Sequence, residues 1–210
     1  MEFQYKGANC ITISTKAGAL ITDPNLVQLG LKKPSFNKID VCLLTDPAFK
    51  PEDIGEAFLI DCPGEYEVKG YAVKGINARS HMAKEDEIDL TTIYRISSNE
   101  ISVVFLGHIF PQLDDLQLEA LGMVDVLVVP VGGNGYTLDA TGAAKLAKLI
   151  DPKIIIATHF ADPQLNYEVP QNGPEDFIKE IGAPHEELEK LKLKKETLPE
   201  TLAVYTLKRS

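Results

Sequence analysis

The sequence predicts an α/β protein in which layers of sheet are covered by helices. The first half of the 210-residue chain consists of short apolar or alternating segments, a pattern typical of strands, with little helical periodicity. The second half alternates helical segments with continuous apolar runs, which are typical of strands covered on both faces. This order favours mixed sheets with helical layers over a doubly wound parallel sheet.

The strands expected in the first half are separated by turn residues. Asp23-Pro24 ends one apolar segment, and Cys62-Pro63-Gly64-Glu65 is a turn after another. We expect strands at residues 10–14, 19–22, 41–44, 57–60, 71–77, 91–96 and 101–106.

Capping residues mark the helices of the second half. Asp139 stands at an N-cap position before a stripe of alanines at helical spacing, and Asp151-Pro152 follows the end of that stripe. Pro174 and Gly182 are the usual end residues of a further helix. We expect helices at 116–121, 140–150 and 174–181, and strands at 124–131, 153–158 and 202–207.

We expect one domain over residues 1–210, because no linker or internal repeat divides the chain and its length allows a substantial core. Three segments, 23–38, 78–90 and 159–173, are predicted to be long loops. Loops of this length in a compact domain are often functional, so they are candidate site segments.

The charge balance limits the classes of partner. Lys and Arg number 21 and Asp and Glu 31, which gives a net charge of −10 and predicts repulsion from nucleic acid and from anionic membrane. The sequence contains neither a signal peptide pattern nor an apolar run long enough to span a bilayer, so we expect a cytoplasmic protein. A small-molecule substrate is the remaining class of partner, and the oligomeric state is left open.

The three cysteines do not indicate a redox or zinc site. Cys10, Cys42 and Cys62 form no CxxC pair, and they stand in apolar stretches. We therefore expect all three to be buried as small hydrophobic residues.

Three of the four histidines follow predicted strands. His81, His108 and His159 stand at strand exits, where a scaffold presents side chains from its rim, whereas His185 lies among polar residues and is expected to be solvated. Neutral imidazole suits borderline metals such as zinc, and three protein ligands leave one position for water. The trio is therefore a candidate metal site.

Two other interpretations of these histidines stay open. Each imidazole could instead cap a loop or bond to nearby backbone, since no HxH or HExxH spacing is present. His108 could also act as a general base without a metal, although Ser80 is suggestive as a nucleophile only because it precedes His81.

The order of segments resembles the metallo-β-lactamase superfamily, in particular its small zinc-dependent hydrolases related to the ascorbate-phosphate lactonases. The resemblance covers about residues 7–160. It is carried by Gly7, Thr22-Asp23-Pro24, Leu43-Leu44-Thr45, Pro63-Gly64-Glu65-Tyr66-Glu67, Leu106-Gly107, the run from Val124 to Gly133 and the run from Asp151 to Phe160. It implies a single domain folded as a four-layer αββα sandwich with mixed sheets.

The resemblance also implies which residues would bind metal. In that family the Leu-Leu-Thr strand leads into HxHxDH, which holds two metal ions, whereas the matching positions here are Asp46, Ala48, Lys50 and Pro51. Alanine and proline side chains donate nothing and a protonated lysine repels cations, so we expect the two-metal site to be lost.

A different, mononuclear site is the alternative to complete loss. His81 and His159 match family ligands, and His108 stands where the metal-bridging aspartate follows Leu-Gly. We therefore predict at most one divalent ion, of zinc, manganese or iron, held by Asp46, His81, His108 and His159, with Asp46 and His108 as catalytic residues. The resemblance implies hydrolysis of a small ester, lactone or phosphodiester. The competing hypothesis is a non-catalytic binding or structural protein without metal.

Three further motifs have weaker interpretations. The loop Gly132–Thr137 precedes a helix and could cradle an anion, but a tight turn is favoured. Glu65 and Glu67 are expected on one exposed face. The alternating segment Lys190–Lys195 is typical of a lysine-protected edge strand.

Overall fold

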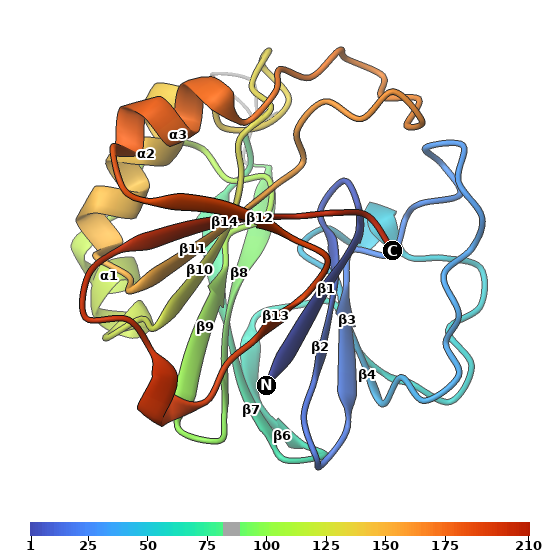
Figure 1. Ribbon diagram of the computed structural model, residues 1–210. Coiled ribbons are helices and arrows are strands. Elements are labelled where there is room, and N and C mark those ends of the chain that lie inside the picture. The colour runs from blue at the N-terminus through green and yellow to red at the C-terminus, as the bar shows by residue number, and fades with distance from the viewer. Residues whose placement is uncertain (82–88) are drawn as a thin grey trace.

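The computed structural model describes residues 1–81 and 89–210 and consists of two sheets packed face to face (Figure 1). The first sheet has the strand order β13-β1-β2-β3-β4-β5, and the second has the order β12-β14-β11-β10-β9-β8-β7-β6. Both sheets mix parallel and antiparallel pairs, as the order of segments predicted.

The first sheet is built mainly from the N-terminal sixty residues. Antiparallel pairs join β1, β2 and β3, whereas β3, β4 and β5 are parallel. Its strands are β1 (Glu2–Gly7), β2 (Cys10–Ser14), β3 (Ala19–Thr22), β4 (Val41–Leu43), β5 (Phe58–Ile60) and the short edge strand β13 (Leu191–Lys192).

The second sheet carries the strands from which the candidate histidines follow. β8 is antiparallel to both β7 and β9, and β9, β10, β11 and β14 are parallel. Its strands are β6 (Gly64–Val68), β7 (Tyr71–Arg79), β8 (Leu90–Ser98), β9 (Ile101–Phe105), β10 (Val126–Pro130), β11 (Ile154–Thr158), β12 (His185–Leu188) and β14 (Ala203–Leu207).

Three α-helices cover the face of the second sheet that is turned away from the first (Figure 1). They are α1 (Asp115–Leu121), α2 (Ala140–Ile150) and α3 (Glu175–Ile181). Side chains of Asp114 and Asp139 accept hydrogen bonds from backbone amides and begin α1 and α2. The predicted N-cap at Asp139 and the C-terminal Gly182 are confirmed.

Hydrophobic packing divides the molecule into four layers. One core lies between the sheets and contains Tyr71, Tyr94 and Phe105, and a second lies between the second sheet and the helices. A third, smaller core covers the outer face of the first sheet and is closed by Leu31, Phe36 and other loop side chains. The outer layer on this side is therefore made of loops and the 3-10 turn η1 (Pro47–Phe49), which appear at the right of Figure 1.

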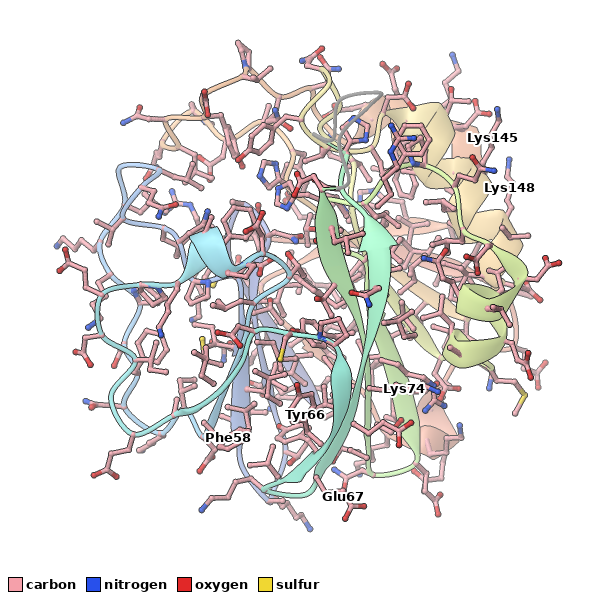
Figure 2. The ribbon with its side chains drawn as sticks, turned by 180° about the vertical axis from the view of Figure 1, so that it is seen from behind. Phe58, Tyr66, Glu67, Lys74, Lys145 and Lys148 are labelled. Atoms are coloured by element: carbon pink, nitrogen blue, oxygen red, sulfur yellow. The ribbon has the colours of Figure 1, made fainter. Side chains whose placement is uncertain are left out.

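The structure corrects the prediction for one cysteine. Cys10 and Cys42 are buried as expected, but Cys62 is exposed. It stands in the turn before β6, and its sulfur lies 3.2 Å from the hydroxyl of Tyr66, which Figure 2 labels on that strand. The segment around Cys62 connects β5, at the edge of the first sheet, to β6, at the edge of the second, and its position at these edges leaves the side chain exposed to solvent.

Several strands were missed because their burial pattern is weak. β6 has exposed Glu65 and Glu67 on one face, as expected for an extended segment, but the turn residues at its start hid the strand. β12 consists of mostly exposed polar residues and forms only because β14 pairs with it. By contrast, the lysine-rich edge strand expected at Lys190–Lys195 is confirmed, as the two-residue strand β13.

Two of the three predicted long loops are confirmed, and the third is shorter than predicted because its ends belong to β7 and β8. Residues 23–38 and 159–173 contain no helix or strand, and β7 and β8 extend to Arg79 and from Leu90. Most of the loop predicted at 78–90 lies outside the described residues. Within residues 1–81 and 89–210, none of the helices combines the length and apolar character needed to cross a bilayer.

A buried polar network ties the two sheets together. The carboxylate of Asp23, after β3, accepts hydrogen bonds from Asn9 Nδ2 at 2.9 Å, Thr45 N at 2.7 Å and Thr45 Oγ1 at 2.8 Å. Asn9 Oδ1 in turn accepts a hydrogen bond from Thr158 Oγ1, at the end of β11 in the second sheet. Because Thr45 and Thr158 directly precede Asp46 and His159, this network positions two candidate site residues.

The Asp23 carboxyl combines burial with hydrogen bonding, and burial prevails. Desolvation raises its pKa to about 7, although the hydrogen bonds from Thr45 and Asn9 act in the opposite direction. The folded state therefore binds a proton more tightly than the unfolded state, whose aspartates have an ordinary pKa. Stability linked to this group is present at low pH and is lost as the pH rises towards 7.

We predict that Asp23→Asn removes this pH dependence. Between pH 5 and pH 8 the wild-type protein should lose roughly 2–3 kcal/mol relative to the variant, because only its Asp23 must ionise while buried. Urea unfolding at the two pH values measures the difference. Asp151→Asn, at an exposed helix end, is the matched control and should follow the wild type. Parallel pH dependences for wild type and Asp23→Asn would contradict the prediction.

Candidate functional site

The topology of the second sheet brings the three predicted histidines to one edge. β7 and β9 are both antiparallel to β8, and β9, β10 and β11 are parallel, so β7, β9 and β11 end at the same edge. His81 follows β7, His108 follows β9 and His159 follows β11. Side chains that are up to 78 residues apart in the sequence therefore share one rim.

His108 and His159 are in direct contact. Their ring centroids are 4.9 Å apart and the rings are almost perpendicular, at 88°. Only 6% of His108 and 2% of His159 is exposed. The backbone N of His81 donates to the backbone O of His108 at 2.8 Å, which fixes the third histidine next to this pair.

Three aromatic side chains enclose the imidazoles. Phe49 lies 5.0 Å from His108, and Tyr136 lies 5.3 Å from His108 and 5.5 Å from His159, between ring centroids. Tyr167 lies 4.9 Å from His159. These residues come from η1 and from two loops, and the sequence analysis missed all three. Each lies in a segment that the sequence had singled out. Tyr167 is in the long loop 159–173, Phe49 is in the segment aligned with HxHxDH, and Tyr136 is in the loop Gly132–Thr137.

Phe49 shows what replaces the HxHxDH motif. The segment after β4 forms the turn η1, and the ring of Phe49 in this turn packs on His108. Gly107, next to His108, lets the segment that begins at Thr45 come this close. Its φ is +64°, and a Cβ at this position would lie only 2.6 Å from Thr45 Cγ2. The segment that the resemblance aligns with the metal-binding motif thus contributes an aromatic cover, from a position between two of the expected ligand positions.

Three buried imidazole nitrogens have no hydrogen-bond partner among residues 1–81 and 89–210. His108 Nδ1, His108 Nε2 and His81 Nδ1 have no hydrogen bond to any described residue. Burying an unsatisfied polar atom costs about 1–3 kcal/mol, so these nitrogens are suited to a metal ion, a water molecule or a substrate group. His159 is partly satisfied, since its Nδ1 lies 3.3 Å from Gln171 Oε1.

Burial keeps the two central imidazoles neutral. Desolvation lowers the pKa of His159 to about 4. It also lowers the pKa of His108 well below the ordinary value, and the neighbouring His159 and His81 act in the same direction. Desolvation lowers the pKa of His81 as well. A neutral imidazole has a free lone pair and can accept a proton or bind a metal.

Asp46 lies at the start of η1 and is half-buried. Its Oδ1 accepts a hydrogen bond from Ala48 N at 2.8 Å, which caps the turn. The hydroxyl of Tyr136 has a raised pKa, mainly through burial and then through the charges of Glu168 and Asp46. The carboxylate of Asp46 therefore acts electrostatically on the same aromatic side chain that contacts the histidines.

The four predicted ligands are not assembled as a metal cage. Among residues 1–81 and 89–210, no three His, Cys, Asp or Glu side chains are arranged so that they could hold a metal ion. The chemistry of the histidines suits a metal, since they are neutral and have unpartnered nitrogens, but their side chains would have to turn to share one ion. The mononuclear site of Asp46, His81, His108 and His159 stays a prediction.

The loop Gly132–Thr137 and His185 do not join the site as ligands. Gly133 N bonds to Leu138 O and Thr137 Oγ1, and Tyr136 N bonds to Gly133 O, so the loop Gly132–Thr137 is a closed turn. His185 is exposed on β12, and its Nε2 lies 2.9 Å from Thr206 Oγ1.

Comparison with known proteins gives the family context of this site. A model of the β-lactamase superfamily domain matches residues 2–159. A metal-dependent hydrolase from Archaeoglobus fulgidus is 30% identical over 88 residues, which cover 42% of this chain and 36% of that protein. The chain thus spans about a third of the length of this curated relative.

Solved structures show the same fold. One is assigned as a zinc-dependent hydrolase of the metallo-β-lactamase superfamily from Thermotoga maritima. It matches with a TM-score of 0.76 and 25% identity, over 99% of this chain and 98% of that one. A metallo hydrolase from Ignicoccus hospitalis matches with a TM-score of 0.61 and 16% identity, over 86% of this chain and 90% of that one.

We predict that acid destabilises the protein through these histidines. Because the folded-state pKa of His159 is about 4 and unfolded histidines titrate near 6.5, the unfolded state binds more protons in this window. The contribution of His159 to the free energy of unfolding should therefore fall as the pH drops from 6.5 to 4, by up to about 1.4 kcal/mol per pH unit.

His159→Asn tests this in chelator-treated protein, because asparagine tolerates the φ of +49° at this position. Urea unfolding across the window should show a weaker pH dependence than in the wild type. His185→Asn on exposed β12 is the control and should retain the wild-type dependence. Equal slopes in all three proteins would refute a neutral, buried His159.

Proposed function

This chain belongs to the metallo-β-lactamase superfamily, and from that membership we propose that it hydrolyses a small ester, lactone or phosphodiester with the help of at most one divalent metal ion. The observation that carries the proposal is the set of buried, unpartnered nitrogens on His108 and His81 beside a neutral His159. Such atoms need a partner that the described residues do not supply.

His81, His108 and His159 would hold the ion. Three neutral imidazoles suit zinc, manganese or iron and leave a coordination position open. When bound, such an ion supplies Lewis acidity and lowers the pKa of a water molecule. A second ion has no ligands at positions 48, 50 and 51, where the chain has Ala48, Lys50 and Pro51.

Asp46 is the candidate general base. Its Oδ1 is engaged by the amide of Ala48, so Oδ2 is the atom that would take a proton from the attacking water. The rings of Phe49, Tyr136 and Tyr167 keep bulk water from the imidazoles and offer an apolar surface to the substrate.

Charge at the entrance favours a neutral substrate. Glu168 and Asp46 are both close enough to Tyr136 to raise the pKa of its hydroxyl, and Tyr136 contacts His108 and His159, so two carboxylate charges lie in the neighbourhood of the histidines. An anionic phosphodiester would be repelled by them, whereas an uncharged ester or lactone would not. Of the three substrate classes, we therefore favour esters and lactones.

A non-catalytic binding protein is the second candidate. It is favoured by the aromatic cover from Phe49 and by the lack of an assembled metal cage among the described residues. In that case the enclosed histidines would bind an organic ligand through hydrogen bonds.

Metal content distinguishes the two candidates. We predict that untagged protein purified without chelators contains up to one equivalent of zinc, manganese or iron by mass spectrometry. His81→Ala and His108→Ala should each weaken metal binding by at least about tenfold. His185→Ala is the matched control and should keep the metal. Metal-free protein whose melting temperature does not respond to chelator would support the binding protein instead.

Catalysis tests the role of Asp46. We predict that p-nitrophenyl butyrate and γ-butyrolactone are hydrolysed faster than bis(p-nitrophenyl) phosphate. Asp46→Asn should lower kcat by about a hundredfold or more, because it removes the base. Asparagine is a good N-cap, so the turn η1 is preserved. Asp53→Asn, on an exposed loop, should not change kcat. An unchanged kcat in Asp46→Asn would remove Asp46 from the mechanism.

A further inference from the structure

A cavity of about 780 Å³, separate from the histidine site, lies on the outer face of the first sheet. Its floor comes from β1, β2 and β3, its cover from residues 31–39, and its rim from Gln164, Arg209 and Ser210. None of the histidines or aromatic residues of the candidate site lines it. The inference drawn from it does not depend on the proposed hydrolase.

The floor is defined by the register of three strands. Gln4, Thr12 and Ile21 are neighbours across β1, β2 and β3, and Ser14 lies beside Ala19. Alternation places them on the outer face, because Phe3 and Ile13 point into the core between the sheets. The floor therefore combines hydroxyl and amide groups with the apolar side chain of Ile21.

The charge of this cavity is opposite to that of the whole chain. Among the described residues, its lining includes no acidic side chain, although the protein has a net charge of −10. Five basic side chains line it, namely Lys6, Lys32, Lys33, Lys38 and Arg209.

Two of these five basic groups are already neutralised by carboxylates outside the cavity lining. Lys33 Nζ lies 2.7 Å from Asp53 Oδ2, and Arg209 Nε lies 2.8 Å from Asp162 Oδ2.

The other three lack an acidic partner in the described part of the chain. Lys6 Nζ donates only to neutral oxygens, Gln4 Oε1 at 3.0 Å and Ser210 Oγ at 2.9 Å. Lys32 and Lys38 form no ion pair with any side chain in residues 1–81 and 89–210. Three positive charges around one cavity repel one another unless an anion joins them.

We propose that this cavity binds a small phosphate monoester. A phosphate monoester carries a charge of about −1.5 to −2 at pH 7, which matches several uncompensated lysines better than a single carboxylate does. Lys6 and the hydroxyl of Thr12 would contact the phosphoryl oxygens, away from Glu2, which pairs with Ser14 at the other end of the floor. Leu31 and Ile39, which line the cavity and are only partly buried, provide an apolar surface for the organic part.

The size of the cavity argues for a small ligand over a nucleic acid. Its volume lies in the range of small-molecule sites, which is roughly 300–1,000 Å³. The acidic remainder of the surface would repel a long polyanion.

A titration of the full chain, in the presence of chelator, tests the proposal. Inorganic phosphate and phenyl phosphate are the probes, and backbone amide signals in nitrogen-15 NMR spectra are the measurement. We expect saturable shifts in β1 and β2, and tighter binding of phenyl phosphate than of phosphate because its ring packs on Leu31 and Ile39. Lys6→Gln should weaken both probes by about tenfold, the effect of losing one charge-assisted hydrogen bond.

Lys145→Gln is the matched control, since it removes the same charge from an exposed position on α2, where Figure 2 labels the side chain. Its affinity for both probes should equal that of the wild type. Three outcomes would overturn the proposal: equal shifts from sodium chloride at matched ionic strength, shifts confined to residues around His108, or equal weakening in the two lysine variants.

Discussion

The buried carboxyl of Asp23 is the interaction on which the site depends. It receives hydrogen bonds from Asn9 and Thr45, and Asn9 reaches Thr158 in the opposite sheet. One polar group, removed from water, thus sets the separation of the two sheets where the strands end. Asp46 and His159 are each one residue beyond this network. A change at Asp23 would therefore alter the site without contacting a histidine.

The same removal from water determines the chemistry of the histidines. Burial lowers the pKa of His108 and His159, and the rings of Phe49, Tyr136 and Tyr167 maintain that burial. Neutral imidazoles with unpartnered nitrogens are costly to keep in a folded protein unless a ligand uses them. The aromatic enclosure and the unsatisfied nitrogens are therefore two parts of one arrangement. This arrangement differs from a site in which the metal ligands already converge on one point, which is not seen among the described residues.

The loop layer on the first sheet gives the molecule a second functional surface. Helices cover the second sheet, whereas residues 23–40 cover the first (Figure 1). Part of this loop layer borders the cavity that is lined by lysines. The charges of Asp46 and Glu168 act on Tyr136 beside the histidines, whereas the cavity on the outer face is lined by basic side chains. We therefore propose ligands of different charge for the two regions, neutral at the histidines and anionic at the cavity.

The sequence by itself predicted the fold class and the helix boundaries, because apolar periodicity and capping residues are local properties. It also selected the three histidines that share a rim, since strand exits can be recognised locally. Only the tertiary structure decided how those histidines meet, which rings enclose them, and that Cys62 is exposed. Contacts such as that of Phe49 with His108 join residues 59 positions apart, and pairings across two sheets leave no local pattern. The basic cavity escaped prediction for the same reason, because its lysines come from separate segments of the chain.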